Sequence, residues 1–298
     1  HACILVCELA NPEQLAADFE AQGKQGAKEF ARLLDALWLG PLDEIERRGG
    51  LIIGWYGDSL WALFPQAGPR EVVAALNALR KMFRQTVLER ENQAGPTPRV
   101  NLLLGWGRMN WQIFANQLQH EYTFFGREKD ALESLPRGGK QVLLTPAASA
   151  KLGTAGLLDK QGDPARGIHM EALSLPQPPL ETDHSLRNLF EHPRFRHLEP
   201  APAFCQVVCN RIKLPRKDHS DPGHLIQDKE LLGITFGALV PGIRINGSEF
   251  SGLVWFGVPG KDPKAAQKAC RAALEARKKF PGIRHGIALG KVFAGMVG

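Results

Sequence analysis

The strongest constraint in the sequence is an internal repeat of three short segments that recur in the same order. Residues 3–8 (CILVCE) parallel residues 205–210 (CQVVCN), residues 60–65 (LWALFP) parallel residues 254–259 (VWFGVP), and residues 100–107 (VNLLLGWG) parallel residues 283–290 (IRHGIALG). Each segment is a short apolar run typical of a buried strand. Three matches in register indicate duplication, so we expect the 298 residues to fold as two copies of one unit.

Amphipathic helical patterns lie between the predicted strands of both copies. The spacing of apolar residues predicts helices over 12–39 and 71–90 in the first copy, and over 224–239 and 263–280 in the second. Each copy then follows the order strand–helix–strand–strand–helix–strand. This is the split βαβ arrangement of ferredoxin-like folds, so the predicted fold class is α+β with two such domains.

A stretch rich in proline and polar residues separates the two copies. It contains PQPPLETDH and HPRFRHLEPAP. We interpret 153–202 as a linker between a first domain at 1–152 and a second domain at 203–298, which we expect to be truncated at its C-terminus. The composition, 44% hydrophobic and 23% charged, is typical of a globular chain, and no apolar run reaches the ~18 residues of a membrane span.

The charge distribution and the cysteines indicate which partners and which cellular compartment to expect. Lys and Arg against Asp and Glu number 15 to 7 over 201–298, but 16 to 17 over 1–150, so the second half is the basic one. This excess fits a polyanionic partner such as a nucleotide, RNA or an acidic protein, or simply the solvated face of the helix at 263–280. The five cysteines lack metal-binding spacing, and we interpret them as buried reduced thiols of a cytosolic protein.

The most specific segment is a predicted hairpin at 52–64 (IIGWYGDSLWALF), whose Gly-Asp turn holds Asp58. Glu8 ends the first strand, which lies beside this hairpin in the sheet of a split βαβ unit. Two carboxylates from adjacent strands suit Mg²⁺, which binds one or two carboxylates together with phosphate oxygens. The alternative is an ordinary turn in which Asp58 has only a structural role.

These segments, in this order, resemble the catalytic domains of class III nucleotidyl cyclases, and the soluble adenylyl cyclases most. Residues 55–64 (WYGDSLWALF) resemble the F-x-G-D-x-L-x-A-L segment of the first cyclase homology unit, and 250–260 (FSGLVWFGVPG) the matching region of the second. Residues 287–298 (IALGKVFAGMVG) are similar to the family's G-x-x-x-G-x-V-x-x-G-x-x-G strand pair. The resemblance implies two cyclase homology domains that form a pseudo-symmetric head-to-tail pair and convert ATP to cyclic AMP and pyrophosphate.

The same resemblance assigns roles to single residues. It implies that Glu8 and Asp58 are the metal ligands and that Arg244 and Asn246 lie on the purine side of the nucleotide site. The metal would be Mg²⁺ or Mn²⁺. The position of a regulatory arginine falls near Glu133.

The second copy lacks a metal pair by the same comparison. Asn210 matches Glu8, and Gly252 matches Asp58. No lysine is found near Arg244 for reading the purine, so the arginine itself is the substitute, and the partner position falls near Gly282, which has no side chain.

Several residues of the first copy depart from the family pattern. Glu8 replaces the usual Asp, and the turn at 10–13 (ANPE) replaces a small-Gly-Phe-Thr turn whose backbone N–H groups receive the triphosphate. Pro12 has no N–H to donate, and the charge of Glu13 repels phosphate. A purely structural interpretation explains the same residues: Asn11 is an N-cap and Pro12 is the first helical residue.

Three functions remain open from the sequence. The first is a catalytically weak or inactive tandem cyclase module, a structural or regulatory pseudocyclase that needs no metal. The second is an active soluble-type adenylyl cyclase, which would use Mg²⁺ or Mn²⁺ at Glu8 and Asp58. An RNA-binding module is a remote third, because RNA-recognition modules share the split βαβ topology, but no strand with the required aromatic and basic residues is found.

The expected partners follow from these hypotheses. They are ATP or another nucleotide, the second domain of the same chain, and proteins of a larger assembly, with no nucleic acid and no membrane span. The expected location is the cytoplasm, to which the resemblance to soluble cyclases adds the cilium or flagellum.

Overall fold

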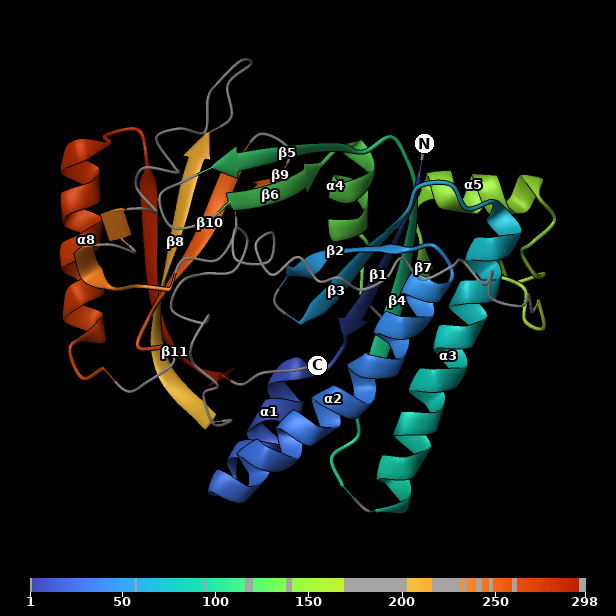
Figure 1. The fold of residues 1–298 in the computed structure, drawn as a ribbon, viewed down its shortest axis with the longest axis horizontal. Helices are drawn as coiled ribbons and strands as arrows, with labels where there is room; N and C mark the ends of the chain where they lie inside the picture. Colours follow the sequence, from blue (N-terminus) through green and yellow to red (C-terminus); the bar gives the residue numbers. More distant parts are fainter. Residues whose placement is uncertain are drawn as a thin grey trace, which may run out of the picture. The chain divides into compact units, whose positions relative to one another are not determined.

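The computed structural model describes residues 2–56, 58–93, 95–115, 120–137, 141–168, 203–215, 231–232, 235–239, 243–246, 249–258 and 262–294. The chain forms two compact units. The first contains the described residues up to Met109 and those from Gly126 to Ile168, and the second contains Asn110–Phe125 and the described residues from Ala203 onward. Figure 1 labels the elements of each unit.

A five-stranded sheet forms the centre of the first unit. Its strands are β1 (Ala2–Leu9), β2 (Leu51–Tyr56), β3 (Ser59–Phe64), β4 (Val100–Gly107) and β7 (Val142–Leu144), in the order β2-β3-β1-β4-β7. β1 is antiparallel to both β3 and β4, and only β7 is parallel to its neighbour. Because β1 is central, its residues from Cys3 to Cys7 are at most 1% exposed, which explains its unbroken apolar run.

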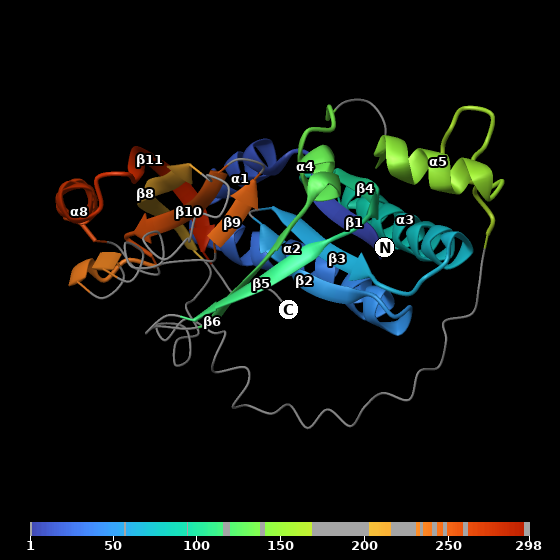
Figure 2. The same ribbon diagram turned by 90° about the horizontal axis from the view of Figure 1, so that it is seen from above.

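Helices cover both faces of this sheet. They are α1 (Pro12–Glu20), α2 (Gly23–Arg47), α3 (Pro69–Asn92), α4 (Arg127–Glu133) and α5 (Pro146–Thr154). α2 and α3 run side by side (Figures 1 and 2), and Trp38 of α2 contacts Trp55 of β2 edge-on, with ring centroids 5.1 Å apart. Trp55 pairs with Leu60, whereas Lys129 of α4 lies over the next residue, Trp61. Consecutive strand residues point to opposite faces, so α4 covers the face opposite α2.

The helix predicted over 12–39 is two helices in the structure, α1 and α2. Gly26, in the first turns of α2, lies so close to α1 that an added Cβ would be 1.9 Å from the carbonyl oxygen of Phe19. The ring of Phe19 stacks on that of Phe30, with centroids 5.2 Å apart. The apolar spacing therefore predicted the buried faces correctly, but not the bend that brings them together. The helix predicted over 71–90 and the hairpin predicted over 52–64 are confirmed as α3 and as β2 with β3.

The second unit repeats the topology of the first. Its strands β8 (Ala203–Pro215), β9 (Ile243–Asn246), β10 (Glu249–Phe256) and β11 (Arg284–Ala294) lie in the order β11-β8-β10-β9, which matches β4-β1-β3-β2. Helix α8 (Ala265–Lys279) buries four alanines, the core of its contact with the sheet: Ala265, Ala269, Ala272 and Ala276. The predicted split βαβ order is thus confirmed for the strands of both units.

One hairpin belongs to the second unit although it interrupts the sequence of the first. β5 (Asn110–Ala115) and β6 (His120–Phe125) pair with each other, and Phe125 packs against the core of the second unit. The hairpin lies inside the predicted first domain at 1–152, so the compact units do not follow the predicted boundary there. The predicted pseudo-symmetric pairing of the two domains stays a prediction.

The strand register corrects one match between the two copies. Trp61 of β3 pairs with Val6, and Trp255 of β10 pairs with Cys209. Aligning the two tryptophans places Arg211, not Asn210, at the position of Glu8. Gly252 keeps the position of Asp58, but it lies within β10 rather than in a turn. The repeated cysteines had suggested a register that differs by one residue.

Parts of the predictions fall outside the described residues. Residues 169–202 of the predicted linker and 224–230 of the predicted helix at 224–239 are among them. Among the residues that the structure describes, no helix combines the length and apolar character that a membrane span requires.

Candidate functional site

The predicted metal ligands come from neighbouring strand ends of the first unit. Glu8 is next to last in β1 and pairs with Ser59, the first residue of β3. Asp58 is the turn residue before β3, and its carbonyl accepts a hydrogen bond of 3.2 Å from the N–H of Leu9. The structure therefore brings Glu8 and Asp58 to the same end of the sheet, Glu8 on β1 and Asp58 directly before the neighbouring strand β3. Asp58 is exposed, whereas the side chain of Glu8 is only 15% exposed.

The carboxylate of Glu8 is bound by an arginine that the sequence analysis did not single out. Arg137 donates from Nε to Oε1 at 3.1 Å and from Nη2 to Oε2 at 2.9 Å. This is the forked, bidentate geometry in which a guanidinium binds a carboxylate most strongly. Because the two residues are 129 positions apart, no local pattern could have revealed the pair.

Arg137 is itself held at the end of α4. Its Nη1 donates to the carbonyl oxygens of Leu132 (2.9 Å), Glu133 (3.3 Å) and Leu135. The last carbonyls of a helix lack hydrogen-bond partners within the helix and carry partial negative charge. A cationic side chain there donates the missing hydrogen bonds and compensates that charge. Arg137 thereby connects the C-terminal end of α4 to the end of β1.

Two polar contacts hold α4 in place on the sheet. Buried Glu128 accepts hydrogen bonds from the backbone N–H of Trp106 (3.0 Å) and from the hydroxyl of Thr145. Lys129, 1% exposed, pairs with Glu133 at 2.6 Å. Glu133, near which a regulatory arginine was expected, is thus the partner of a buried lysine. A buried ammonium requires such a partner, and this one lies within α4 itself. Lys129 contacts the sheet through the ring of Trp61, whose centroid is 5.7 Å from Nζ.

The residues present do not fit a two-metal site as they are arranged. Mg²⁺ needs oxygen ligands at near-ideal octahedral positions. One of the two predicted carboxylates is bound by a guanidinium, whose charge already compensates that of Glu8. A metal at Glu8 would first have to displace Arg137.

The turn that leads into α1 is also bonded to the protein itself. The N–H of Leu9 donates to Asp58, and the N–H of Ala10 donates to the carbonyl of Arg99 at 2.7 Å. Pro12 has no N–H and is the first residue of α1, as the structural interpretation predicted. Within the turn at 10–13, the N–H of Ala10 is therefore already bonded to the protein, and Pro12 has none to offer.

Asn11 occupies the N-cap position of α1, but its side chain does not cap the helix. Its amide donates to the carbonyl of Thr97 at 3.2 Å and accepts from the N–H of Arg99 at 2.8 Å. The side chain thus ties the turn to the segment that enters β4.

The cysteines of β1 are buried, as predicted. Cys3 and Cys7 are 0% exposed, and burial raises the pKa of both thiols far above the ordinary range. Cys209 of β8, which was also expected to be buried, is half-buried, and Cys270 of α8, outside the strand-like runs, is exposed.

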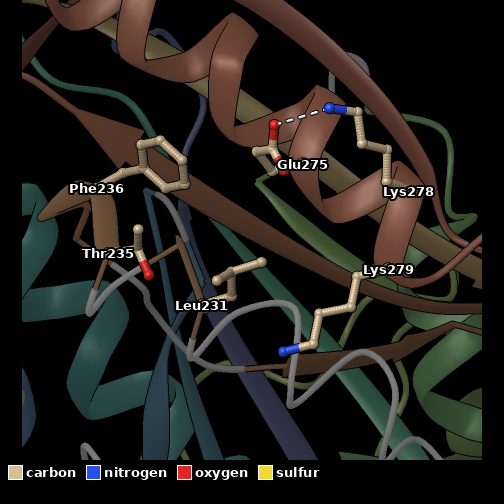
Figure 3. A pocket seen from close by; sticks show the side chains of 6 residues that line it. All are labelled: Leu231, Thr235, Phe236, Glu275, Lys278 and Lys279. Atoms are coloured by element: carbon tan, nitrogen blue, oxygen red, sulfur yellow. Dashed lines mark hydrogen bonds and ion pairs between the residues drawn. The ribbon is translucent and has the colours of Figure 1, made fainter.

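The predicted purine-side residues lie on β9 of the second unit. Arg244 pairs with Ser251 and Asn246 pairs with Glu249 in the ladder with β10. Their side chains lie outside the described set, so their role stays a prediction. A separate cavity of about 350 Å³ in this unit lies beside the C-terminal half of α8, where Lys278 pairs with Glu275 at 3.0 Å (Figure 3). None of the predicted site residues lines it.

Comparison with known proteins identifies the fold. No protein-family model and no curated protein matches the chain. Among solved structures, a class III adenylyl cyclase-like ATP-binding protein from Pseudomonas aeruginosa matches 99% of this chain and 76% of its own, with a TM-score of 0.61 at 13% identity. The guanylyl cyclase Cya2 (16% identity, 52% of this chain and 78% of its own, TM-score 0.42) and the adenylyl cyclase CyaB from P. aeruginosa (19%, 51% and 80%, 0.41) also match. The first of these matches shows that the chain has the fold of a class III adenylyl cyclase-like protein.

Proposed function

We propose that the chain is a tandem cyclase-fold module that does not turn over ATP and acts as a structural or regulatory pseudocyclase. The observation that carries this proposal is the turn between β1 and α1. In an active site of this fold, the turn would present backbone N–H groups to a triphosphate. Here the N–H of Ala10 in the turn donates to the carbonyl of Arg99, and Pro12 has no N–H. The N–H of Leu9, at the end of β1 just before the turn, donates to the carbonyl of Asp58.

Charge at the same end of the sheet supports the proposal. Glu13 lies in the first turn of α1, where it stabilises the helix but repels a phosphate. The charge of the Glu8 carboxylate is compensated by the guanidinium of Arg137, so this carboxylate does not attract a cation as an unpaired one would. Misplacement of reacting groups by ~1 Å can lower a rate about 100-fold, so these changes together predict little or no turnover.

The alternative function is an active soluble-type adenylyl cyclase that converts ATP to cyclic AMP and pyrophosphate with Mg²⁺ or Mn²⁺. One observation favours it: Glu8 and Asp58 do lie at the same end of the sheet. In this alternative, Arg244 and Asn246 would recognise the purine.

The partners proposed for the module are ATP or another nucleotide, the other domain of the same chain, and proteins of a larger assembly. The P. aeruginosa neighbour is an ATP-binding protein, which makes ATP the first nucleotide to test. A cytoplasmic or ciliary location stays a prediction from the resemblance alone.

The test is to measure cyclic AMP formed by the purified chain from ATP with Mn²⁺ and with Mg²⁺, beside the variant Asp58→Asn. We expect no difference between the two proteins. Turnover that Asp58→Asn abolishes would establish the adenylyl cyclase and end the pseudocyclase proposal. Salt-sensitive binding of RNA, measured in parallel, would instead favour the remote alternative.

A further inference from the structure

The pair Glu8–Arg137 explains why position 8 holds a glutamate where the cyclase pattern has an aspartate. Arg137 meets the carboxylate through two donors: Nε lies 3.1 Å from both Oε1 and Oε2, and Nη2 lies 2.9 Å from Oε2. An aspartate would draw its carboxylate back by about one carbon–carbon bond, ~1.5 Å. At that separation neither bond would remain within hydrogen-bond distance.

The arginine is fixed independently of the glutamate. Three backbone carbonyls after and at the end of α4 accept from Nη1, so the guanidinium stays beside β1 even when Glu8 is changed. A group held at one end in this way loses little conformational entropy when it binds a second partner.

The pair is also partly shielded from water. The side chain of Glu8 is 15% exposed and that of Arg137 is 31% exposed. Screening by solvent is therefore weaker than for a surface pair such as Glu275–Lys278, whose side chains are 55% and 72% exposed.

We infer that Arg137 takes the place of the metal ion as a covalently attached cation, and that glutamate at position 8 serves to reach it. Glu8 and Arg137 are then positioning residues that connect the end of β1 to the end of α4, and Glu8 is not a metal ligand. This inference rests on the proposed function, since it concerns the same site, but it is tested by stability and metal binding without nucleotide.

The decisive variant is Glu8→Asp, because the two roles predict opposite results. If Glu8 is the partner of Arg137, Glu8→Asp lowers the unfolding midpoint of the chain by about 2–4 °C and leaves it unable to bind Mn²⁺. If Glu8 is a metal ligand, Glu8→Asp restores the family's residue, keeps the midpoint and tightens Mn²⁺ binding at least about tenfold. The second result would overturn the inference.

Further variants separate the pair from a general loss of stability. Arg137→Met should lower the midpoint, and the double variant Glu8→Gln/Arg137→Met should fall no further than Arg137→Met alone. Arg137→Lys should not restore the wild-type midpoint, because an ammonium lacks the fork. Lys278→Met, which removes the cation of an exposed pair, is the matched control and should change the midpoint by less than about 1 °C. Additive losses in the double variant would contradict the inference.

The unfolding midpoint is read by thermal denaturation, and Mn²⁺ binding by the electron paramagnetic resonance signal of the free ion. The two proposals fail separately. Cyclic AMP from the wild-type chain would end the proposed function even if the pair is coupled, whereas independent Glu8 and Arg137 in a chain without turnover would end only this inference.

Discussion

At the scale of single residues, the turn before α1 depends on contacts that are distant in sequence. Asn11 was interpreted as a helix cap because Asn before Pro is typical of a helix start. The position is correct, but the side chain bonds to Thr97 and Arg99, 86 and 88 residues away. Local sequence rules see only local partners, and for the same reason they could not find Arg137 beside Glu8.

Replacing Asn11 with alanine should lower the free energy of unfolding by about 1–2 kcal/mol, because one side chain loses a donated and an accepted hydrogen bond. Urea denaturation measures the change. Gln25→Ala is the control, since Gln25 makes one exposed bond to Glu29 within α2, and it should cost less than about 0.5 kcal/mol. Equal losses in both variants would show that the Asn11 contacts contribute nothing special.

At the scale of elements, most helices and strands could be predicted, because apolar spacing reports which face is buried. α3, α8 and the β2–β3 hairpin lie where the pattern placed them. The break between α1 and α2 could not be predicted, because it depends on how closely Gly26 approaches the carbonyl of Phe19. Close packing of two elements is set in three dimensions, and the sequence shows only that a small residue is present.

β4 and β11 give a matched test of such close packing. By the strand register, Gly290 of β11 corresponds to Gly105 of β4 and not to Gly107, to which the repeated segments had matched it. Gly105 pairs with Ile4, and Gly290 pairs with Val207. A Cβ added at Gly105 would lie 2.9 Å from Leu132 and 3.0 Å from Glu128 of α4, whereas one at Gly290 would have no atom within 4 Å. Only the first glycine is needed to seat a helix.

Gly105→Ala should therefore destabilise the chain by about 1–3 kcal/mol, because α4 must move away from β4. Gly290→Ala should change the free energy of unfolding by less than about 0.5 kcal/mol. Urea denaturation of both variants decides the matter. A neutral Gly105→Ala would mean that α4 is not seated on β4 as described.

At the scale of the whole molecule, the internal repeat predicted the strand topology of both units, but not which residues of the second unit correspond to those of the first. Three matching segments were enough to predict two split βαβ units, since strand order follows from element order in this fold. They could not reveal that Arg211, rather than Asn210, takes the register position of Glu8. Nor could they show that Asn110–Phe125 packs with the second unit, because an apolar hairpin does not show in its own sequence which core it joins.

Acid should destabilise the second unit, which holds three groups of lowered pKa. Burial lowers the pKa of His285 from its ordinary 6.5. A hydrogen bond from Lys213 lowers that of Glu249 from 4.5, and one from Lys268 lowers that of Asp262 from 3.8. In each case the unfolded chain takes up the proton first as the pH falls, so folding stability decreases. The histidine acts below pH 6.5, and the two carboxylates act only below about pH 4.5.

His285→Gln isolates the first of these effects. The free energy of unfolding of the wild-type chain should fall as the pH is lowered from 7 to 5.5, and the variant should fall less over that interval, because glutamine does not titrate. Urea midpoints at each pH provide the measurement. Parallel pH profiles for the two proteins would rule out a contribution from His285.

Because Cys3 and Cys7 are buried in the central strand, the rate at which they react with a thiol reagent reports the rate at which the first unit opens. An alkylating reagent needs both access and a thiolate, and the folded β1 provides neither, whereas Cys270 on α8 is open to it. Peptide mass spectrometry of one alkylation reaction would thus show two modification rates. Cys270 would be modified at once, and Cys3 and Cys7 only after a delay. The delay is the waiting time before the first unit opens. The thiols of β1 would in this way report how long the first unit stays folded, with no added probe.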